Sequence, residues 1–280
     1  MAVEQELSGP GAAWSPRWAP GPWRLSPRLR RWALGLLLPL ALTGLAELAV
    51  RSGWLTSRLL PAPSEIWSTL LQLADQGLGA HVAASSARVL SGFALGAGVA
   101  VLLGVLVGLS PLAAALLSPT LQGLRAIPSL AWVPLLLLWL GIDEASKVVL
   151  IAIGAFFPVY MGVASGIRDV DRKLVEVARL RGLRGRDLAW RVLLPAALPA
   201  LLNGLRLGLS LAWMFMVAAE LIAASRGLGY LLTDGRETGR ADIVLAAILL
   251  LALMGKLSDG LMAALEQRAL HWRDAFGGHA

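Results

Sequence analysis

Five stretches of this chain are apolar over the length that a helix needs to cross a lipid bilayer. A bilayer core of about 30 Å requires about 20 apolar helical residues. The first stretch carries only Glu47, and the second and third carry no charged residue. The five stretches are residues 32–50, 89–109, 148–166, 192–222 and 243–263. A chain built from such segments is expected to fold inside a membrane.

The composition agrees and excludes several classes of protein. Hydrophobic residues make up 57% of the 280 residues and charged residues only 15%, against about 25% charged in soluble domains. Cysteine is absent, which excludes disulfides and thiolate metal ligands. The three histidines have no metal-ligand spacing. We therefore expect neither a catalytic group nor a metal site in this chain.

The stretch 112–142 is ambiguous because Arg125 and three prolines interrupt it. As one straight helix, its 31 residues would be about 46 Å long, which exceeds the bilayer. It forms either two short spans, or a membrane-edge segment over about 112–126 followed by one span over about 127–141.

Charge distribution favours six spans over seven. Lys and Arg gather on the cytoplasmic side of membrane proteins. Basic residues cluster before the first stretch, between 168 and 191, and after the last stretch. All three clusters face the cytoplasm only if the number of spans is six. The sequence thus predicts an all-α polytopic membrane protein with both termini cytoplasmic and spans at about 32–50, 89–109, 127–141, 147–166, 192–222 and 243–263.

The predicted organisation is one transmembrane domain, residues 32–267, between two cytoplasmic tails. The N-terminal tail, 1–31, is rich in Pro, Gly and Trp without periodicity and is expected to be mobile. The C-terminal tail is 268–280. Because the excess of positive charge faces inward, it is expected to meet anionic lipid and cytoplasmic partners rather than nucleic acid.

Residues 168–191, called the elbow below, carry twelve charged residues in 24 positions between two apolar spans. Asp171 is a suitable N-cap for a first helix that runs to Leu180. Gly182 and Gly185 break this helix, and a second short helix follows. The sequence therefore predicts a helix–glycine–helix elbow on the cytoplasmic surface.

The first helix of the elbow has a short apolar face made by Leu174, Val177, Ala178 and the stem of Arg181. A simple loop that its arginines hold inside would explain the charge, but it would not require the glycine break. A helix with an apolar ridge and basic flanks suits insertion into a groove of another protein.

The elbow resembles the EAA loop of ABC importer permeases, whose pattern is E-A-A, three residues, G, nine residues, I-x-L-P. The matching residues are Glu176, Val177, Ala178, Gly182, Val192, Leu194 and Pro195. Val177 replaces an alanine and Val192 replaces an isoleucine, and both keep a compact apolar surface. The resemblance implies that these residues form the loop that docks on an ATP-hydrolysing subunit.

The resemblance extends over nearly the whole chain after the tail and indicates the nitrate/sulfonate/taurine branch of these permeases. It implies a type I ABC importer permease fold in a bacterial inner membrane. Within the branch the chain is most similar to aliphatic sulfonate permeases, although relatives for nitrate, taurine and pyrimidine precursors share most of the motifs. These include Leu60–Glu65, Ile127-Pro128, Trp139–Glu144, Phe157–Tyr160, Gly166–Arg168, Ala218–Glu220, Gly227–Tyr230 and Gly255–Leu257.

The resemblance also implies the partners: a second copy of the chain, two cytoplasmic ATP-binding subunits and an external solute-binding protein. The sequence holds no G-x-x-x-x-G-K-[ST] phosphate loop, because Gly255-Lys256 is followed by Leu257. ATP and Mg are therefore expected on the partner ATPase, and this chain is expected to be a transport subunit rather than an enzyme.

Four residues of the fifth span are candidates for the solute pathway: Arg206, Trp213, Met216 and Glu220. A charged residue inside a span is a functional candidate by default. For Arg206, reaching to the interface or to a neighbouring carbonyl is the structural alternative. Trp213 and Met216 lie mid-span, where they could contact an alkyl chain.

Other charged residues of the spans have structural interpretations. Glu220 could pair with Arg226 or Arg88 rather than line the pathway. Lys256 and Asp259, three residues apart in the last span, are predicted to pair on one helix face.

Two other classes of function remain to be weighed. A secondary transporter or channel would need no ATPase, but the chain shows no internal repeat and no paired mid-span acids. A membrane-embedded enzyme would need a nucleophile–base or metal constellation, and none is visible in the sequence.

Overall fold

The computed structural model describes residues 27–54, 56 and 60–271, and its regular elements there are all helices. Residues 1–26 of the predicted N-terminal tail and 272–280 of the predicted C-terminal tail lie outside the described residues. In chain order the elements are α1 (Pro27–Arg51), α2 (Pro63–Asp75), α3 (Leu78–Leu109), α4 (Pro111–Ala126), η1 (Ser129–Trp132), α5 (Val133–Leu140), α6 (Glu144–Arg168), α7 (Arg172–Leu180), α8 (Gly185–Leu188), η2 (Ala189–Leu193), α9 (Leu194–Ala223), α10 (Leu228–Glu237) and α11 (Ala241–Ala269).

Among the described residues, four helices are long and apolar enough to cross a membrane: α3, α6, α11 and the continuous helix Gly185–Ile222. A fifth crossing is added if the bent pair of α4 with η1 and α5 is counted as one. The 25-residue helix α1 contains the predicted span 32–50 and begins at Pro27, inside the predicted tail. The six-span prediction thus depends on α1 and on the bent pair, in addition to the four long helices.

The region that the sequence left ambiguous is a broken helix pair. The segments Pro111–Ala126 and Ser129–Leu140, which lie close to the predicted ranges 112–126 and 127–141, meet at 88°. Ile127 is extended, with ψ at 123°, because a residue before proline disfavours the helical region. The eight residues of α5 would cover only about 12 Å as a helix.

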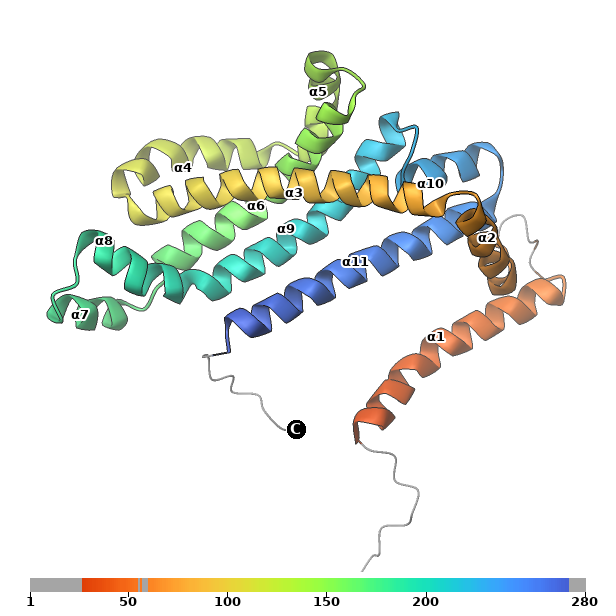
Figure 1. The fold of residues 1–280 in the computed structure, drawn as a ribbon, viewed down its shortest axis with the longest axis horizontal. Coiled ribbons are helices and arrows are strands. Elements are labelled where there is room, and N and C mark those ends of the chain that lie inside the picture. Colours follow the sequence, from red (N-terminus) through yellow and green to blue (C-terminus); the bar gives the residue numbers. More distant parts are fainter. Residues whose placement is uncertain (1–26, 55, 57–59, 272–280) are drawn as a thin grey trace, which may run out of the picture.

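The centre of the bundle is α6, which packs between α3 and α9 (Figure 1). On α3, a stripe of small residues allows close approach. A Cβ atom on Gly104 would lie 2.7 Å from the Cβ of Val163, and one on Gly96 would overlap the backbone of Ala152. The stripe therefore packs α3 closely against α6 within one chain.

The other face of α6 packs against a second row of glycines, which belongs to α9. A Cβ atom on Gly204 would lie 3.0 Å from the carbonyl oxygen of Pro158, and one on Gly208 would lie 2.7 Å from Val159 Cγ2. The three helices α3, α6 and α9 therefore form the rigid layer to which the other elements attach.

The two ends of the bundle differ. We call the end that carries α7 and α8 the elbow end; α2 and α10 lie at the opposite end (Figure 1). At the opposite end α2 begins at Pro63, with Ala62 as its N-cap residue. The Ser64 N–H and hydroxyl donate to Glu47 of α1, at 3.1 and 2.8 Å.

Candidate functional site

The first helix of the elbow, α7, begins as the sequence predicts. The carboxylate of Asp171 accepts a hydrogen bond from the backbone N–H of Lys173 at 2.9 Å, which caps the helix. Glu176 accepts a hydrogen bond from Arg172, one turn earlier, at 2.9 Å. Both of these side chains are exposed, so the pair orders the helix surface without anchoring it.

The turn after α7 requires a glycine. The Gly182 N–H donates to the carbonyl of Arg179 at 2.9 Å, and the Leu183 N–H donates to the carbonyl of Ala178 at 3.1 Å. This pair of bonds closes a helix with a left-handed residue, and Gly182 has φ of +84°. Gly185 also has a positive φ, +51°, where α8 begins. The predicted glycine break is thus confirmed at both positions.

The second half of the elbow continues into the membrane helix without a break. After α8, one π-helical turn, η2, leads directly to α9. Pro195 has no N–H for the carbonyl of Arg191, and the Leu194 N–H bonds to Ala189, five residues back. Of the motif residues here, Val192 and Leu194 are half-buried and Pro195 is exposed.

The elbow is fixed to the bundle at only a few points. Ala178, Leu188 and Ala189 are its buried side chains. Its outer surface carries exposed apolar side chains: Val177 is 54% exposed and Leu180 is 88% exposed. The exposed apolar residues are Leu174, Val177, Leu180 and Trp190.

The residues of the predicted apolar face of α7 do not all face the same way in the structure. Ala178 faces the bundle, whereas Leu174 and Val177 face outward, and Leu180 joins them although the sequence analysis did not single it out. Eight basic and four acidic residues surround this surface. An exposed apolar ridge with basic flanks is suited to binding another protein. Within the described residues, no group of three metal-ligating side chains occurs.

Arg206, the first pathway candidate, belongs to α9, and its side chain extends towards α11. Its Nη2 donates to Asp259 Oδ2 at 2.9 Å, and its Nη1 lies 3.9 Å from Glu266 Oε2. The predicted pair of Lys256 with Asp259 is therefore wrong, because Asp259 is bound by an arginine of the neighbouring helix. Arg206 remains 40% exposed.

Trp213 and Met216, the next two candidates, belong to the core. They pack with Leu150 and Ile151 of α6, and Met216 is fully buried. The Nε1–H of Trp213 is also buried, and it meets no hydrogen-bond acceptor among the described residues.

Glu220, the last candidate, is the centre of a buried polar network at the opposite end. It accepts hydrogen bonds from Arg88 Nη1 at 2.7 Å, from Ser85 Oγ at 2.8 Å and from the Gly229 N–H at 2.7 Å. Its side chain has no exposed surface. The interpretation that pairs Glu220 with Arg88 is confirmed.

Arg88 extends this network to α6 and to the segment between α9 and α10. Its Nε and Nη2 donate to Glu144 at 2.6 and 2.7 Å, and its Nη1 also donates to the carbonyl of Arg226 at 2.6 Å. Arg226, the other partner considered for Glu220, contributes this carbonyl. The sequence analysis missed Ser85 and Glu144, which lie 135 and 76 residues from Glu220 and carry no local signal.

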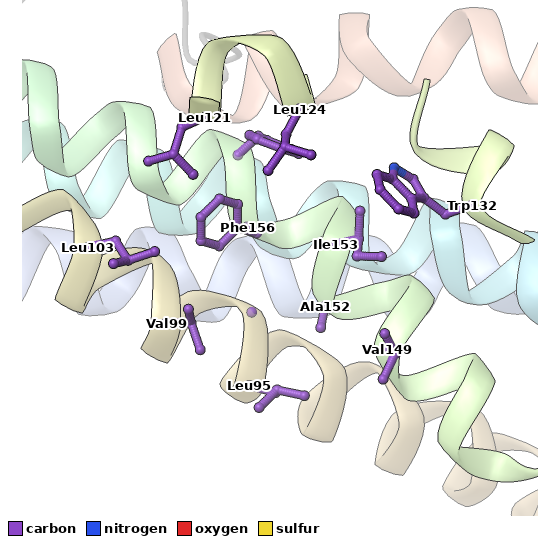
Figure 2. Close-up of a pocket in the computed structure, with 12 residues that line it drawn as sticks. Leu95, Val99, Leu103, Leu121, Leu124, Trp132, Val149, Ala152, Ile153 and Phe156 are labelled. Atoms are coloured by element: carbon purple, nitrogen blue, oxygen red, sulfur yellow. The ribbon is translucent and has the colours of Figure 1, made fainter. Parts of the chain in front are cut away.

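An apolar pocket of about 380 Å³ lies between α3, α4, α6 and η1 (Figure 2). Leu121 and Leu124 of α4 lie over one side, and Trp132 of η1 lies at one end. Its lining offers no exposed polar atom, so it has no group that could hold an anion.

Comparison with known proteins places the chain in a family. The family model described as "Binding-protein-dependent transport system inner membrane component" matches residues 100–271. A Bacillus subtilis protein named as an aliphatic sulfonates transport permease, SsuC, is 42% identical over 88% of this chain and 90% of its own length. The Escherichia coli protein of the same name is 41% identical over 89% and 96%.

More distant relatives carry other substrate names. The Escherichia coli taurine transport system permease protein TauC is 35% identical over 86% of this chain and 92% of its own. An inward-facing structure of the MetNI methionine ABC transporter matches with a TM-score of 0.57 at 22% identity, over 66% of this chain and 92% of that one. It shows a shared fold. The chain is a multi-pass membrane protein of the family of binding-protein-dependent transport system inner membrane components.

Proposed function

We propose that this chain is the permease subunit of an ATP-driven importer and forms the translocation pathway for a small organic anion, with aliphatic sulfonates as the solute. Two relatives named for aliphatic sulfonates, at 41% and 42% identity over most of both chains, support this solute. Taurine, nitrate or a pyrimidine precursor is the alternative within the same branch, and a taurine relative at 35% identity keeps it open.

The exposed ridge of the elbow is the observation that carries the ATP-driven function. Leu174, Val177 and Leu180 expose apolar surface on a short helix that touches its own chain mainly through Ala178. A cluster of exposed apolar side chains on a short helix indicates a surface that another protein covers. We assign it to a cytoplasmic ATP-binding subunit, which binds the ATP and Mg that this chain has no loop to hold.

The complete importer in this proposal contains two copies of the permease, two ATP-binding subunits and an external solute-binding protein. The elbow end and both termini face the cytoplasm, and the solute-binding protein docks at the opposite end. Closure of the ATP-binding pair would move the two elbows together and shift the spans between inward-open and outward-open arrangements.

Within this pathway Arg206 is the candidate that a solute could reach in a single chain, because its side chain is 40% exposed. Trp213, Met216 and Glu220 are buried, so contact with a solute would require α9 to part from its neighbours during the cycle. We therefore assign Arg206 the more direct role.

The test is co-purification and transport. The chain is expressed with an ATP-binding subunit and a solute-binding protein, and Val177→Asp is compared with Leu38→Ala, an exposed position of α1. Val177→Asp should abolish co-purification of the ATPase and ATP-dependent uptake of ethanesulfonate, whereas Leu38→Ala should preserve both.

A secondary transporter would give a different result. Uptake would then continue without ATPase or ATP, and Val177→Asp would transport as well as the unchanged protein. Either observation would overturn the ATP-driven function.

A further inference from the structure

A second cavity, of about 510 Å³, lies along α4 and α6 and differs from the apolar pocket in its polar lining. On α4 it is lined by Ser118, Gln122 and Arg125, which follow each other at spacings of four and three residues and so share one helix face. Leu121 and Leu124, on the neighbouring face of the same helix, line the apolar pocket instead (Figure 2).

The opposite wall of this cavity comes from the last turns of α6. Ser165 and Arg168 lie there, followed by Asp169. Arg168 Nη2 donates to the carbonyl of Val107 at 3.3 Å and to Ser118 Oγ at 3.5 Å, so its guanidinium joins α6 to the last turn of α3 and to the middle of α4.

Arg125 lies in the last turn of α4, and its side chain is exposed. On the α6 side, the cavity that it lines runs from Arg168 to Tyr160. These two residues are eight positions, about 12 Å of helix, apart. The cavity therefore extends from the elbow end into the predicted span 147–166.

The charge of the cavity is positive. Two arginines and one aspartate line it, which leaves one net positive charge. Over residues 27–54, 56 and 60–271, Arg125 takes part in no ion pair. An exposed guanidinium at this depth is costly against lipid chains, so it requires water or an anion.

We propose that this cavity is an anion-binding subsite of the solute pathway, in which Arg125 binds the oxyanion group of the solute. The amide of Gln122 and the hydroxyl of Ser118 offer further hydrogen-bond donors along the same face. Met161 and Ala164 provide an apolar wall that a short alkyl chain would contact. A sulfonate matches both features, because it joins a monovalent oxyanion to an apolar body.

This inference rests on the proposed function, since it assigns a subsite to the same pathway. The phosphate of an anionic phospholipid has the same oxyanion chemistry and is a second source of the ligand. The test must therefore separate a transported solute from a bound lipid.

The experiment uses the complete importer in vesicles of phosphatidylcholine alone and in vesicles that also contain phosphatidylglycerol. Ethanesulfonate uptake and ATP hydrolysis are measured for the unchanged protein, Arg125→Gln, Arg125→Lys and the control Arg268→Gln, which replaces an exposed arginine near the end of α11. Arg125→Gln should lower uptake per ATP hydrolysed about tenfold or more in both lipids, because a hydrogen bond to a charged group is lost. Arg125→Lys should recover most of the loss, and Arg268→Gln should match the unchanged protein.

The outcomes are distinguishable. If the unchanged protein shows no ATP-driven uptake, the proposed function itself fails. If it transports and Arg125→Gln transports equally well, the subsite is wrong. A loss that occurs only with phosphatidylglycerol would assign the cavity to a lipid headgroup and also overturn the inference. If Arg125→Gln does not assemble, Gln122→Leu provides the second test, with a smaller loss of uptake per ATP expected and unchanged transport contradicting the subsite.

Discussion

Gly182 is a single residue on which the shape of the elbow depends. Its φ of +84° favours glycine, and a Cβ atom there would meet nothing within 4 Å. The cost of a side chain is therefore conformational rather than steric.

Gly182→Ala should strain the turn by about 1 kcal/mol and disfavour the bonds that close α7. We expect weaker binding of the ATP-binding subunit, by about tenfold at most, while the thermal unfolding of the bundle stays unchanged. Titration of the purified permease with the ATPase measures the first, and a melting curve in detergent measures the second. If Gly182→Ala and the unchanged permease bind the ATP-binding subunit with equal affinity, the geometry of this turn does not control docking.

Glu220 is important for stability rather than for docking. Arg88, Ser85 and the N-terminus of α10 all donate hydrogen bonds to its buried carboxylate. Removing one partner of a buried ion pair is strongly destabilising, because the other charge stays in a low-dielectric site.

Glu220→Gln should therefore lower the free energy of unfolding by about 3 kcal/mol. Arg88 retains Glu144 as a partner, which keeps the loss at the lower end of the range for buried pairs. The control is Glu237→Gln at an exposed site, 3.9 Å from Arg236, which should change stability little. Thermal unfolding in detergent compares Glu220→Gln with Glu237→Gln. Similar melting temperatures of the two variants would contradict the stabilising role given to this network.

Local residue patterns predicted the residue-scale features that depend on neighbours in sequence. Asp171 as a cap and Gly182 as a break follow from the chain within a few positions. The partners of Glu220 and Asp259 could not be fixed in this way. Arg206 and Asp259 are 53 residues apart, and which of several nearby charges they meet depends on how α9 packs against α11.

At the scale of elements, the packing of α3 on α6 depends on which glycines of α3 face its neighbour. Gly96 lies against the backbone of Ala152, whereas Gly98, two residues later, faces open space. The two positions provide a matched pair within one helix.

Gly96→Ala should destabilise the protein by about 1–3 kcal/mol, because the added methyl group overlaps backbone that cannot move aside. Gly98→Ala should be neutral or slightly stabilising, because alanine favours the helix. Both variants are compared by thermal unfolding and by the fraction that remains monodisperse in detergent. Equal losses in the two would show that helix propensity, not contact with α6, sets the result.

The spans within α6, α9 and α11 were predicted from hydropathy because each is a long apolar run, although α11 continues six residues beyond the predicted end at 263. For the broken pair of α4 and α5 the sequence left two alternatives open, since hydropathy does not give the direction of a helix. The prolines signalled an interruption, but an 88° bend also depends on the packing of Leu121 and Trp132 against the bundle.

At the scale of the whole molecule, the sequence predicts an orientation in which the elbow end faces the cytoplasm. Cysteine labelling can test this orientation directly. The chain contains no cysteine, so each introduced cysteine is a unique label. Leu180, at the elbow end, and Trp54, at the opposite end, are both strongly exposed.

In intact cells a membrane-impermeant maleimide should label Trp54→Cys and leave Leu180→Cys unlabelled. In inside-out vesicles Leu180→Cys should react, and an added ATP-binding subunit should protect it. Labelling of Leu180→Cys from outside would place the elbow on the wrong side of the membrane for ATP-driven transport.

The continuous helix Gly185–Ile222 gives the molecule a lever arm. Its 38 residues measure about 57 Å, almost twice the thickness of the hydrocarbon core. One end carries half of the elbow, and near the other end Glu220 holds it to α3 and α10. A tilt of about 10° around that anchored end would carry the elbow through about 10 Å. One residue inserted at η2 would instead turn the elbow by about 100° about the helix axis, so a partner could still bind yet push in the wrong direction.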